Sequence, residues 1–113
     1  MPNSYREIAV FFMCCLLVSG AKATEAEDVF SVAKLDVGRR LIAENACNGS
    51  CHQSYTDDND PISLYTRQNR KVRSAKALVA QVERCVNRLN ASIFPEEAND
   101  IAAVLNHDYY KFK

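Results

Sequence analysis

The spacing of apolar residues predicts three main helices, of which the first covers residues 29–45. Five apolar residues of that segment fit helical spacing: Val32, Leu35, Val37, Leu41 and Ile42. Gly38 lies in the middle of the segment, although a Gly in a helix interior costs about 1 kcal/mol relative to Ala. It therefore indicates either a break in the helix or a close crossing by another helix. Residues 24–28 are polar, and we expect them to be frayed.

The clearest apolar stripe predicts the second helix over residues 75–90, with Ser74 as its N-cap. Four residues form that stripe: Leu78, Val82, Cys85 and Leu89. Pro95 fits the first position of the third helix, which has acidic residues in its first turn. The residues of this helix expected to face inward are Ile101, Val104 and Leu105. Because no strand-like alternation occurs, the sequence predicts an all-α fold with one long middle loop.

Residues 1–23 have the pattern of a secretory signal peptide. A short polar start precedes an apolar run over 8–20, and the A-x-A sequence of Ala21 to Ala23 follows that run. The run is shorter than the ~20 residues that a membrane-spanning helix needs, and a retained membrane anchor is the alternative. We expect cleavage after Ala23, a single domain over 24–113, and export to the periplasm or an equivalent bacterial compartment.

The composition of the 113-residue chain narrows its function. Its 14 Lys and Arg balance its 14 Asp and Glu, so it has no excess positive charge for binding nucleic acid or an anionic membrane. Both methionines lie in the predicted leader, and three of the five cysteines follow it: Cys47, Cys51 and Cys85. An odd number of cysteines in an exported protein indicates a free thiol, an intermolecular bridge or a use other than disulfides. So short a domain has a thin core, which a disulfide, metal or cofactor commonly supplements.

The run CNGSCH, from Cys47 to His52, is the strongest chemical signal in the chain. Cys-x-x-Cys-His is the attachment sequence of haem c. Its two thiols bond to the vinyl groups of the haem, and the adjacent His reaches the iron. Here the spacing is one residue longer, and Gly49 would help the longer loop to bulge. Three alternatives stay open: a Cys47–Cys51 disulfide, a zinc site of these two cysteines with His52 and Cys85, and a Cys85 that is simply buried.

On these residues the chain resembles the class I cytochromes c, over roughly Leu35 to Tyr110. It shares a Gly-containing first helix before the cysteine loop, a long middle loop, and a last helix that begins Phe94-Pro95-Glu96-Glu97. The Cys-x3-Cys-His loop, the V-x-x-C helix and the terminal Tyr-Tyr-Lys-Phe are also similar to the subunits of the anammox-type Nax cytochrome heterodimer. The resemblance implies a small class I cytochrome c-like fold, with three main helices around one covalently bound haem c and the last helix crossing the first near its Gly. It also implies that Cys47 and Cys51 attach the haem and that His52 binds its iron.

The ligand on the other side of the iron departs from the usual family pattern. The usual Met is impossible, because no Met follows residue 23. A subgroup of cytochromes c has Cys–iron coordination, and we favour Cys85, the thiol that the attachment motif leaves over. His107 is the rival ligand, in a polar stretch beside Asp108, and Lys76 is a more distant alternative.

A thiolate ligand stabilises ferric over ferrous iron and so lowers the reduction potential. With two axial ligands and no evident acid–base cluster, the sequence favours low-potential electron transfer, and we do not expect an enzyme. One alternative is a sensor or binder of nitric oxide or carbon monoxide, in which the gas displaces Cys85. Another is a structural haem subunit of a larger complex. The expected partners are a redox protein and a second small cytochrome subunit, with no nucleic acid and, after removal of the leader, no membrane.

Other residues have a structural interpretation beside a functional one. A basic cluster either pairs with haem propionates, whose charge favours Arg, or forms a solvated loop. The members of this cluster are Arg67, Arg70, Lys71 and Arg73. Tyr65 and Phe94 are expected to line the haem pocket. The terminal aromatic residues form a partner surface if they are exposed, or close the haem crevice if they pack back. They are Tyr109, Tyr110 and Phe112, interspersed with Lys111 and Lys113.

Overall fold

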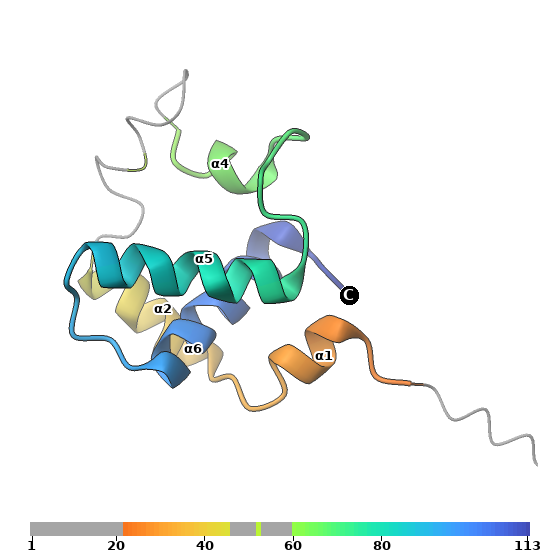
Figure 1. Ribbon diagram of the computed structural model, residues 1–113, viewed down its shortest axis with the longest axis horizontal. Helices are drawn as coiled ribbons and strands as arrows, with labels where there is room; N and C mark the ends of the chain where they lie inside the picture. The colour runs from red at the N-terminus through yellow and green to blue at the C-terminus, as the bar shows by residue number, and fades with distance from the viewer. Residues whose placement is uncertain (1–21, 46–51, 53–59) are drawn as a thin grey trace, which may run out of the picture.

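Helix α6 (Pro95–Leu105) lies at the centre of the fold, because almost all of its residues from Ala98 onward are buried. It packs against α2 (Leu35–Glu44) and against α5 (Ala75–Arg88). Figure 1 shows these three longer helices gathered into one bundle. All three helices that the apolar spacing predicts are therefore present.

The computed structural model describes three stretches of the chain: 22–45, 52 and 60–113. Two short helices, α1 (Glu25–Val29) and α4 (Ser63–Thr66), accompany the bundle, and a π-helical turn, η1 (Asn106–Tyr110), continues α6. Helix α1 contacts α5, and α4 contacts η1. Within these stretches the fold is all-α, with five α-helices and no strand, which confirms the predicted fold class at this level.

Gly38 allows α2 and α6 to approach each other closely. A β-carbon at this position would lie 2.3 Å from the main-chain oxygen of Asp100 and 2.7 Å from Cγ2 of Val104. Both distances are well inside van der Waals contact, so only Gly fits here without movement of α6. Helix α2 runs unbroken through Gly38. Of the two explanations that the sequence left open, the close helix crossing is confirmed and the break is wrong.

The N-terminal part of the fold differs from the prediction. The helix expected over 29–45 begins only at Leu35, and Val32, which was assigned to its apolar positions, is 83% exposed in the preceding connection. The polar residues expected to be frayed form α1 instead. Its N-terminus is a capping box, in which the side chains of Thr24 and Glu27 each accept a hydrogen bond from the other residue's main-chain N–H. The Thr-x-x-Glu sequence is a recognised signal of such a helix start.

Two polar residues of α6 fasten this N-terminal segment to the core. Asn99 Nδ2 donates to the main-chain oxygen of Val29, at the end of α1, over 3.0 Å. Buried Asp100 accepts a hydrogen bond from the main-chain N–H of Lys34 at 2.8 Å. Lys34 is the N-cap of α2 and provides no side-chain cap of its own. The Asp100 carboxylate therefore satisfies an N–H at the start of α2 and places negative charge at the positive end of the helix dipole.

Helix α5 matches the second predicted helix except at its C-terminal end. Ser74 Oγ accepts a hydrogen bond from Ala77 N–H at 3.1 Å, which confirms Ser74 as the N-cap. Four apolar residues of the helix are buried: Ala75, Leu78, Val82 and Val86. The helix ends at Arg88, and the chain turns through Asn90 in the left-handed conformation, with φ of 54°. Leu89, which the stripe places on the apolar face, lies beyond the helix and is 62% exposed, so that part of the prediction is wrong.

The predicted leader lies almost entirely outside the described residues. Residues 1–21 are not among them, so cleavage after Ala23 stays a prediction. In the part of the chain that is described, no helix combines the length and the apolar character that crossing a membrane requires.

Candidate functional site

His52 hydrogen-bonds to the phenol of Tyr65. Its Nδ1 lies 2.9 Å from Tyr65 Oη, and the two rings meet edge to face, with 6.0 Å between centroids. Because Nδ1 is engaged by the phenol, Nε2 is the ring nitrogen left for another ligand. The imidazole is half-buried, and this burial lowers the pKa of His52. Burial therefore favours the neutral ring, which is the form that binds metals.

Tyr65 is fixed by contacts with several parts of the chain. It lies on α4 with only 5% of its surface exposed. Its ring stacks on Tyr109 at 5.4 Å between centroids and contacts Tyr110 at 5.8 Å. Its main-chain oxygen accepts a hydrogen bond from Arg70 Nη1 at 3.1 Å. We call Tyr65, Tyr109 and Tyr110 the aromatic cluster; it supports the phenol that contacts His52.

Arg70 holds the C-terminal residues against the core. Its guanidinium carbon lies 5.0 Å from the ring centroid of Tyr110 and 5.3 Å from that of Phe112. Nη2 also donates to the main-chain oxygen of Tyr110 at 3.3 Å. Tyr110 is buried, and Asn106 hydrogen-bonds to both the main-chain N–H and the oxygen of Phe112. Of the two expectations for the terminal aromatic residues, the packed arrangement is confirmed.

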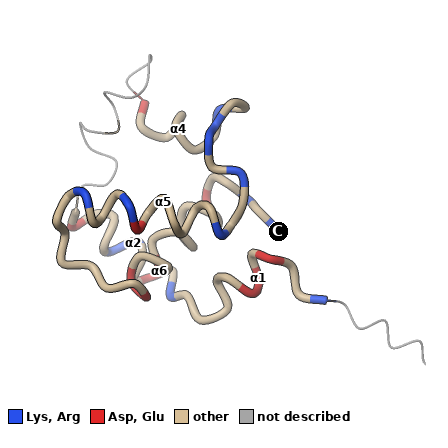
Figure 2. Tube along the Cα trace, in the orientation of Figure 1, with Lys and Arg blue, Asp and Glu red and all other residues tan. Residues whose placement is uncertain are grey.

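The other members of the basic cluster face solvent. Figure 2 shows Lys and Arg gathered along the connection between α4 and α5. Arg67, Lys71 and Arg73 are exposed there, whereas Arg70 is half-buried and bonded to main-chain oxygens. The three exposed residues therefore keep their charge accessible to an anionic group, while the fork of Arg70 serves the protein itself.

Cys85 lies half-buried on α5, and its sulfur faces a hydrogen-bond donor. Gln81 Nε2 is 3.4 Å from Cys85 Sγ. Arg84 Nη2 donates to Gln81 Oε1 at 2.8 Å. A guanidinium can only donate hydrogen bonds, so it fixes Oε1 on its own side and leaves the amide N–H directed at the sulfur. Arg84, Gln81 and Cys85 thus form a short hydrogen-bonded chain along one face of the helix.

The same sulfur lies within electrostatic range of the aromatic cluster. Burial raises the pKa of the Tyr110 phenol above its ordinary value of 10.0, and the charge of Cys85 adds to that rise. Positive charge on Arg70 acts in the opposite direction. Tyr110 also contacts the ring of Tyr65, which bonds to His52, so the charge of Cys85 acts on a member of the cluster that supports His52.

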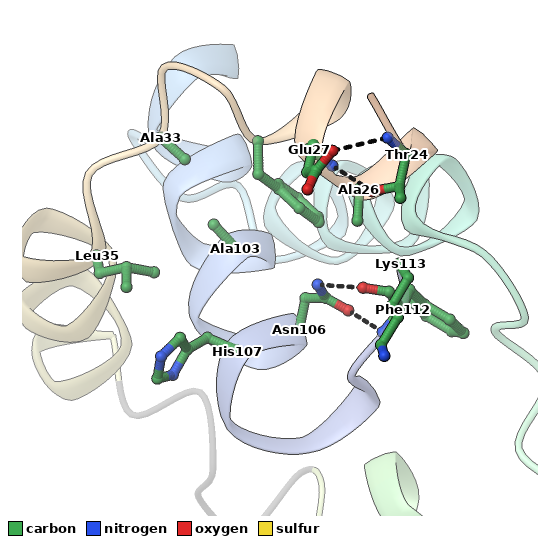
Figure 3. Close-up of a pocket in the computed structure, with 11 residues that line it drawn as sticks. Thr24, Ala26, Glu27, Ala33, Leu35, Ala103, Asn106, His107, Phe112 and Lys113 are labelled. Carbon is green, nitrogen blue, oxygen red and sulfur yellow. Dashed lines mark hydrogen bonds between the residues drawn. The ribbon is translucent and has the colours of Figure 1, made fainter. Parts of the chain in front are cut away.

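His107 belongs to a different part of the molecule. It lines an open cavity of about 620 Å³ between α1, α6 and the C-terminal tail, to which neither His52 nor Cys85 contributes (Figure 3). Its side chain is 61% exposed, and its Nδ1 lies 2.8 Å from a carboxylate oxygen of Asp108. Asp108 also binds Arg39 through two hydrogen bonds, of 2.6 and 3.1 Å. The hydrogen bond from Arg39, followed by that from His107, lowers the pKa of Asp108 to about 2.

Two further predicted site residues lie at the surface. Lys76 is exposed in the first turn of α5, and its main-chain N–H donates to Glu25 at 3.1 Å. Phe94 was expected to line the pocket, but its side chain is 66% exposed. It is the residue before α6, where its main-chain N–H donates to Glu97 at 2.9 Å. This cap fixes the backbone of Phe94 and leaves its ring exposed, and its place beside a haem stays a prediction.

Cys47 and Cys51, which are predicted to attach haem, lie outside the described residues. Among the residues that are described, no three His, Cys, Asp or Glu side chains gather as a metal site. The zinc alternative needs both of these cysteines, so it stays open together with haem attachment. No protein-family model, curated protein or solved structure matches the chain. The motif and the geometry around His52 and Cys85 are therefore the features that point to a function.

Sequence reasoning missed the partners of Cys85. The apolar stripe of the second helix gave Gln81 and Arg84 no role. Gln81 lies four positions before Cys85 and three positions before Arg84. Helical side chains at these two separations lie next to each other. That spacing was the available signal, because a Gln placed between an Arg and a Cys can bond to both.

Proposed function

We propose that this chain is an exported monohaem c-type cytochrome that transfers electrons at low potential. Cys47 and Cys51 would attach one haem c, His52 would bind its iron, and Cys85 would supply the second protein ligand. The observation that carries the proposal is the bond from His52 Nδ1 to Tyr65. It leaves Nε2 for iron on the His that directly follows the paired cysteines.

The surroundings of His52 fit a metal-binding imidazole. Metal-bound His residues commonly donate their second N–H to a neighbouring group, which fixes the orientation of the ring. The phenol of Tyr65 supplies such a group at 2.9 Å. When bound, the haem iron supplies one-electron redox chemistry, and the part of the protein is to hold the ligands and set their donor strength.

Cys85 is the best candidate for the second ligand among the described residues. It is half-buried on α5 and lies within electrostatic range of Tyr110, in the aromatic cluster that also contacts His52. His107, in contrast, is mostly exposed and hydrogen-bonded to Asp108. Cys85 also has no disulfide partner within the described stretches, as a thiol reserved for a metal requires.

The helix crossing supports the finer fold assignment. In the class I cytochromes c that the sequence resembles, the last helix crosses the first near a Gly. Gly38 lies at such a crossing between α2 and α6. The longer helices are α2, α5 and α6, and Cys85 comes from the middle one. These features support a cytochrome c-like fold with three main helices around the haem.

A His and Cys ligand pair supports electron transfer over catalysis. With both of these residues bound to the iron, the haem would have no coordination site left for a substrate. The negative charge of a thiolate favours ferric iron, which gives a low reduction potential. The partner is a redox protein of the same compartment, and a second small cytochrome subunit belongs to the same proposal.

The decisive experiment is expression of the full chain, with its leader, in a bacterium that matures c-type cytochromes. We expect a pyridine haemochrome spectrum and haem that stays bound to the protein through acid–acetone extraction. The intact mass should match a mature chain that starts at Thr24. The variant with Cys47→Ala and Cys51→Ala should lose the covalent haem. Cys85→Ala is the matched control, since it removes a thiol that does not attach haem and should retain it. Haem lost on extraction, or zinc bound in place of haem, would overturn the proposal.

A further inference from the structure

The phenol of Tyr65 is held in place by contacts that do not involve His52. Its ring stacks on Tyr109 with 24° between the planes, and Arg70 holds its main-chain oxygen. Only 5% of the residue is exposed. The hydroxyl group therefore has a fixed position, and the bond to His52 is set by the fold around Tyr65.

The direction of this hydrogen bond follows from the state of the imidazole. When Nε2 of a neutral imidazole binds a metal, Nδ1 carries the ring proton and can only donate. Tyr65 Oη, 2.9 Å away, is then the acceptor. An acceptor at Nδ1–H draws the proton outward and makes the imidazole a stronger electron donor to the metal. A stronger donor stabilises ferric iron relative to ferrous iron.

From this geometry we infer that Tyr65 is a positioning residue that orients His52 and lowers the reduction potential of the iron it binds. The inference rests on the proposed function, because it needs a metal at Nε2. Tyr65 touches neither iron nor Cys85 in this role and acts only through His52. It would reinforce the effect of a thiolate ligand, since both favour the ferric state.

The test is a redox titration of the haem-loaded protein carrying Tyr65→Phe. Phenylalanine keeps the ring and its stacking on Tyr109 but removes the acceptor oxygen. We expect the equilibrium between ferric and ferrous protein to move on the order of tenfold towards the ferrous form, which is about 59 mV for a one-electron couple. The iron–imidazole stretching frequency, from resonance Raman spectra of the ferrous protein with Cys85 displaced, should fall as well. Tyr109→Phe is the matched control, because Tyr109 stacks on Tyr65 without bonding to His52.

A second variant keeps the inference testable if Tyr65→Phe folds poorly. A meta-fluorotyrosine at position 65 keeps the hydroxyl group but weakens it as an acceptor, so the potential should rise by a smaller amount in the same direction. Equal shifts in Tyr65→Phe and Tyr109→Phe, or no shift in either, would refute the role of Tyr65 alone. A wild-type chain that matures without haem would refute the proposed function, and this inference with it.

Discussion

Gly38 of α2 lies directly against the main-chain carbonyl group of Asp100 in α6. A β-carbon on Gly38 would be 2.3 Å from the carbonyl oxygen and 2.7 Å from the carbonyl carbon. The same Asp100 uses its side chain to accept the N–H of Lys34 at the start of α2. One residue of α6 therefore sets both the distance between the two helices and the point where α2 begins.

The first prediction concerns Gly38→Ala. Alanine favours a helix interior by about 1 kcal/mol, yet its methyl group would collide with main-chain atoms that cannot rotate away. We expect the collision to win and the free energy of unfolding to fall by about 2 kcal/mol, measured by urea denaturation. Arg40→Ala, at an exposed position of the same helix, is the control and should change stability little. Equal stability of wild type and Gly38→Ala would mean that the helices do not cross this closely.

The second prediction concerns the buried carboxylate of Asp100. Asp100→Ala leaves the N–H of Lys34 without its acceptor, and we expect a loss of about 1–2 kcal/mol in the free energy of unfolding. Asp100→Asn keeps an oxygen in the same place and loses only the charge, so it should cost less. Hydrogen exchange at the Lys34 amide would separate the two variants, with fast exchange in Asp100→Ala alone. Equal exchange in both variants would argue against the cap.

The helix crossing could be predicted from the sequence because Gly38 conflicts with its own surroundings. A Gly in an otherwise good helix needs a reason, and close packing is one of two. The start of α2 could not be predicted in the same way. Val32 has the right spacing for the helix. The capping box of Thr24, however, forms α1 from residues that were expected to be frayed. Asp100, far along the chain, then fixes Lys34 as the N-cap of α2. Apolar spacing carries no information about such distant polar contacts.

The candidate site shows the same division. The sequence predicts His52 as a ligand from its position after Cys51, and Cys85 from the lack of any Met after residue 23 and its place on the apolar stripe. Their neighbours depend on tertiary structure: Tyr65 meets His52 through the packing of α4 against η1. The exposure of Phe94, which follows from its place just before α6, could likewise not be predicted from apolar spacing.

The third prediction is a pH effect at Asp108. Its pKa is lowered from 3.8 to about 2, mainly by the hydrogen bond from Arg39. A carboxyl group with a lowered pKa stabilises the fold above its ordinary pKa, and this contribution is lost as the pH falls through the folded value. The difference in thermal stability between wild type and Asp108→Asn should therefore be constant above about pH 4 and vanish towards pH 2.

The size of this effect is small, because Arg39 is half-exposed and surface ion pairs contribute little. Glu44→Gln is the control, since its pair with Arg40 is longer, at 3.8 Å, and more exposed. That variant should change thermal stability little. A stability difference for Asp108→Asn that persists at the acid end would mean that the carboxylate acts through something other than its charge.

The fourth prediction concerns the donor to Cys85. Gln81→Leu removes the amide N–H that lies 3.4 Å from the sulfur and leaves a side chain of similar size. A thiolate without this hydrogen bond keeps more of its charge for iron, so the reduction potential should fall, opposite to the shift expected for Tyr65→Phe. Asn87→Leu, at an exposed amide on the same helix, is the control. A potential that rises, or one that moves equally in both variants, would contradict the contact.

The last prediction tests Cys85 as the second ligand. Cys85→Met should keep the iron low-spin and raise the potential on the order of hundreds of millivolts, because a neutral thioether no longer favours ferric iron and axial ligands set haem potentials over about 0.8 V. Cys85→Ala should open the position, giving high-spin ferric iron and stronger binding of carbon monoxide to the ferrous form. His107→Ala is the matched control and should leave the ferric spectrum unchanged, since His107 is already bonded to Asp108. The opposite pattern, with an unchanged spectrum in Cys85→Ala and an altered one in His107→Ala, would make the protein a bis-histidine cytochrome.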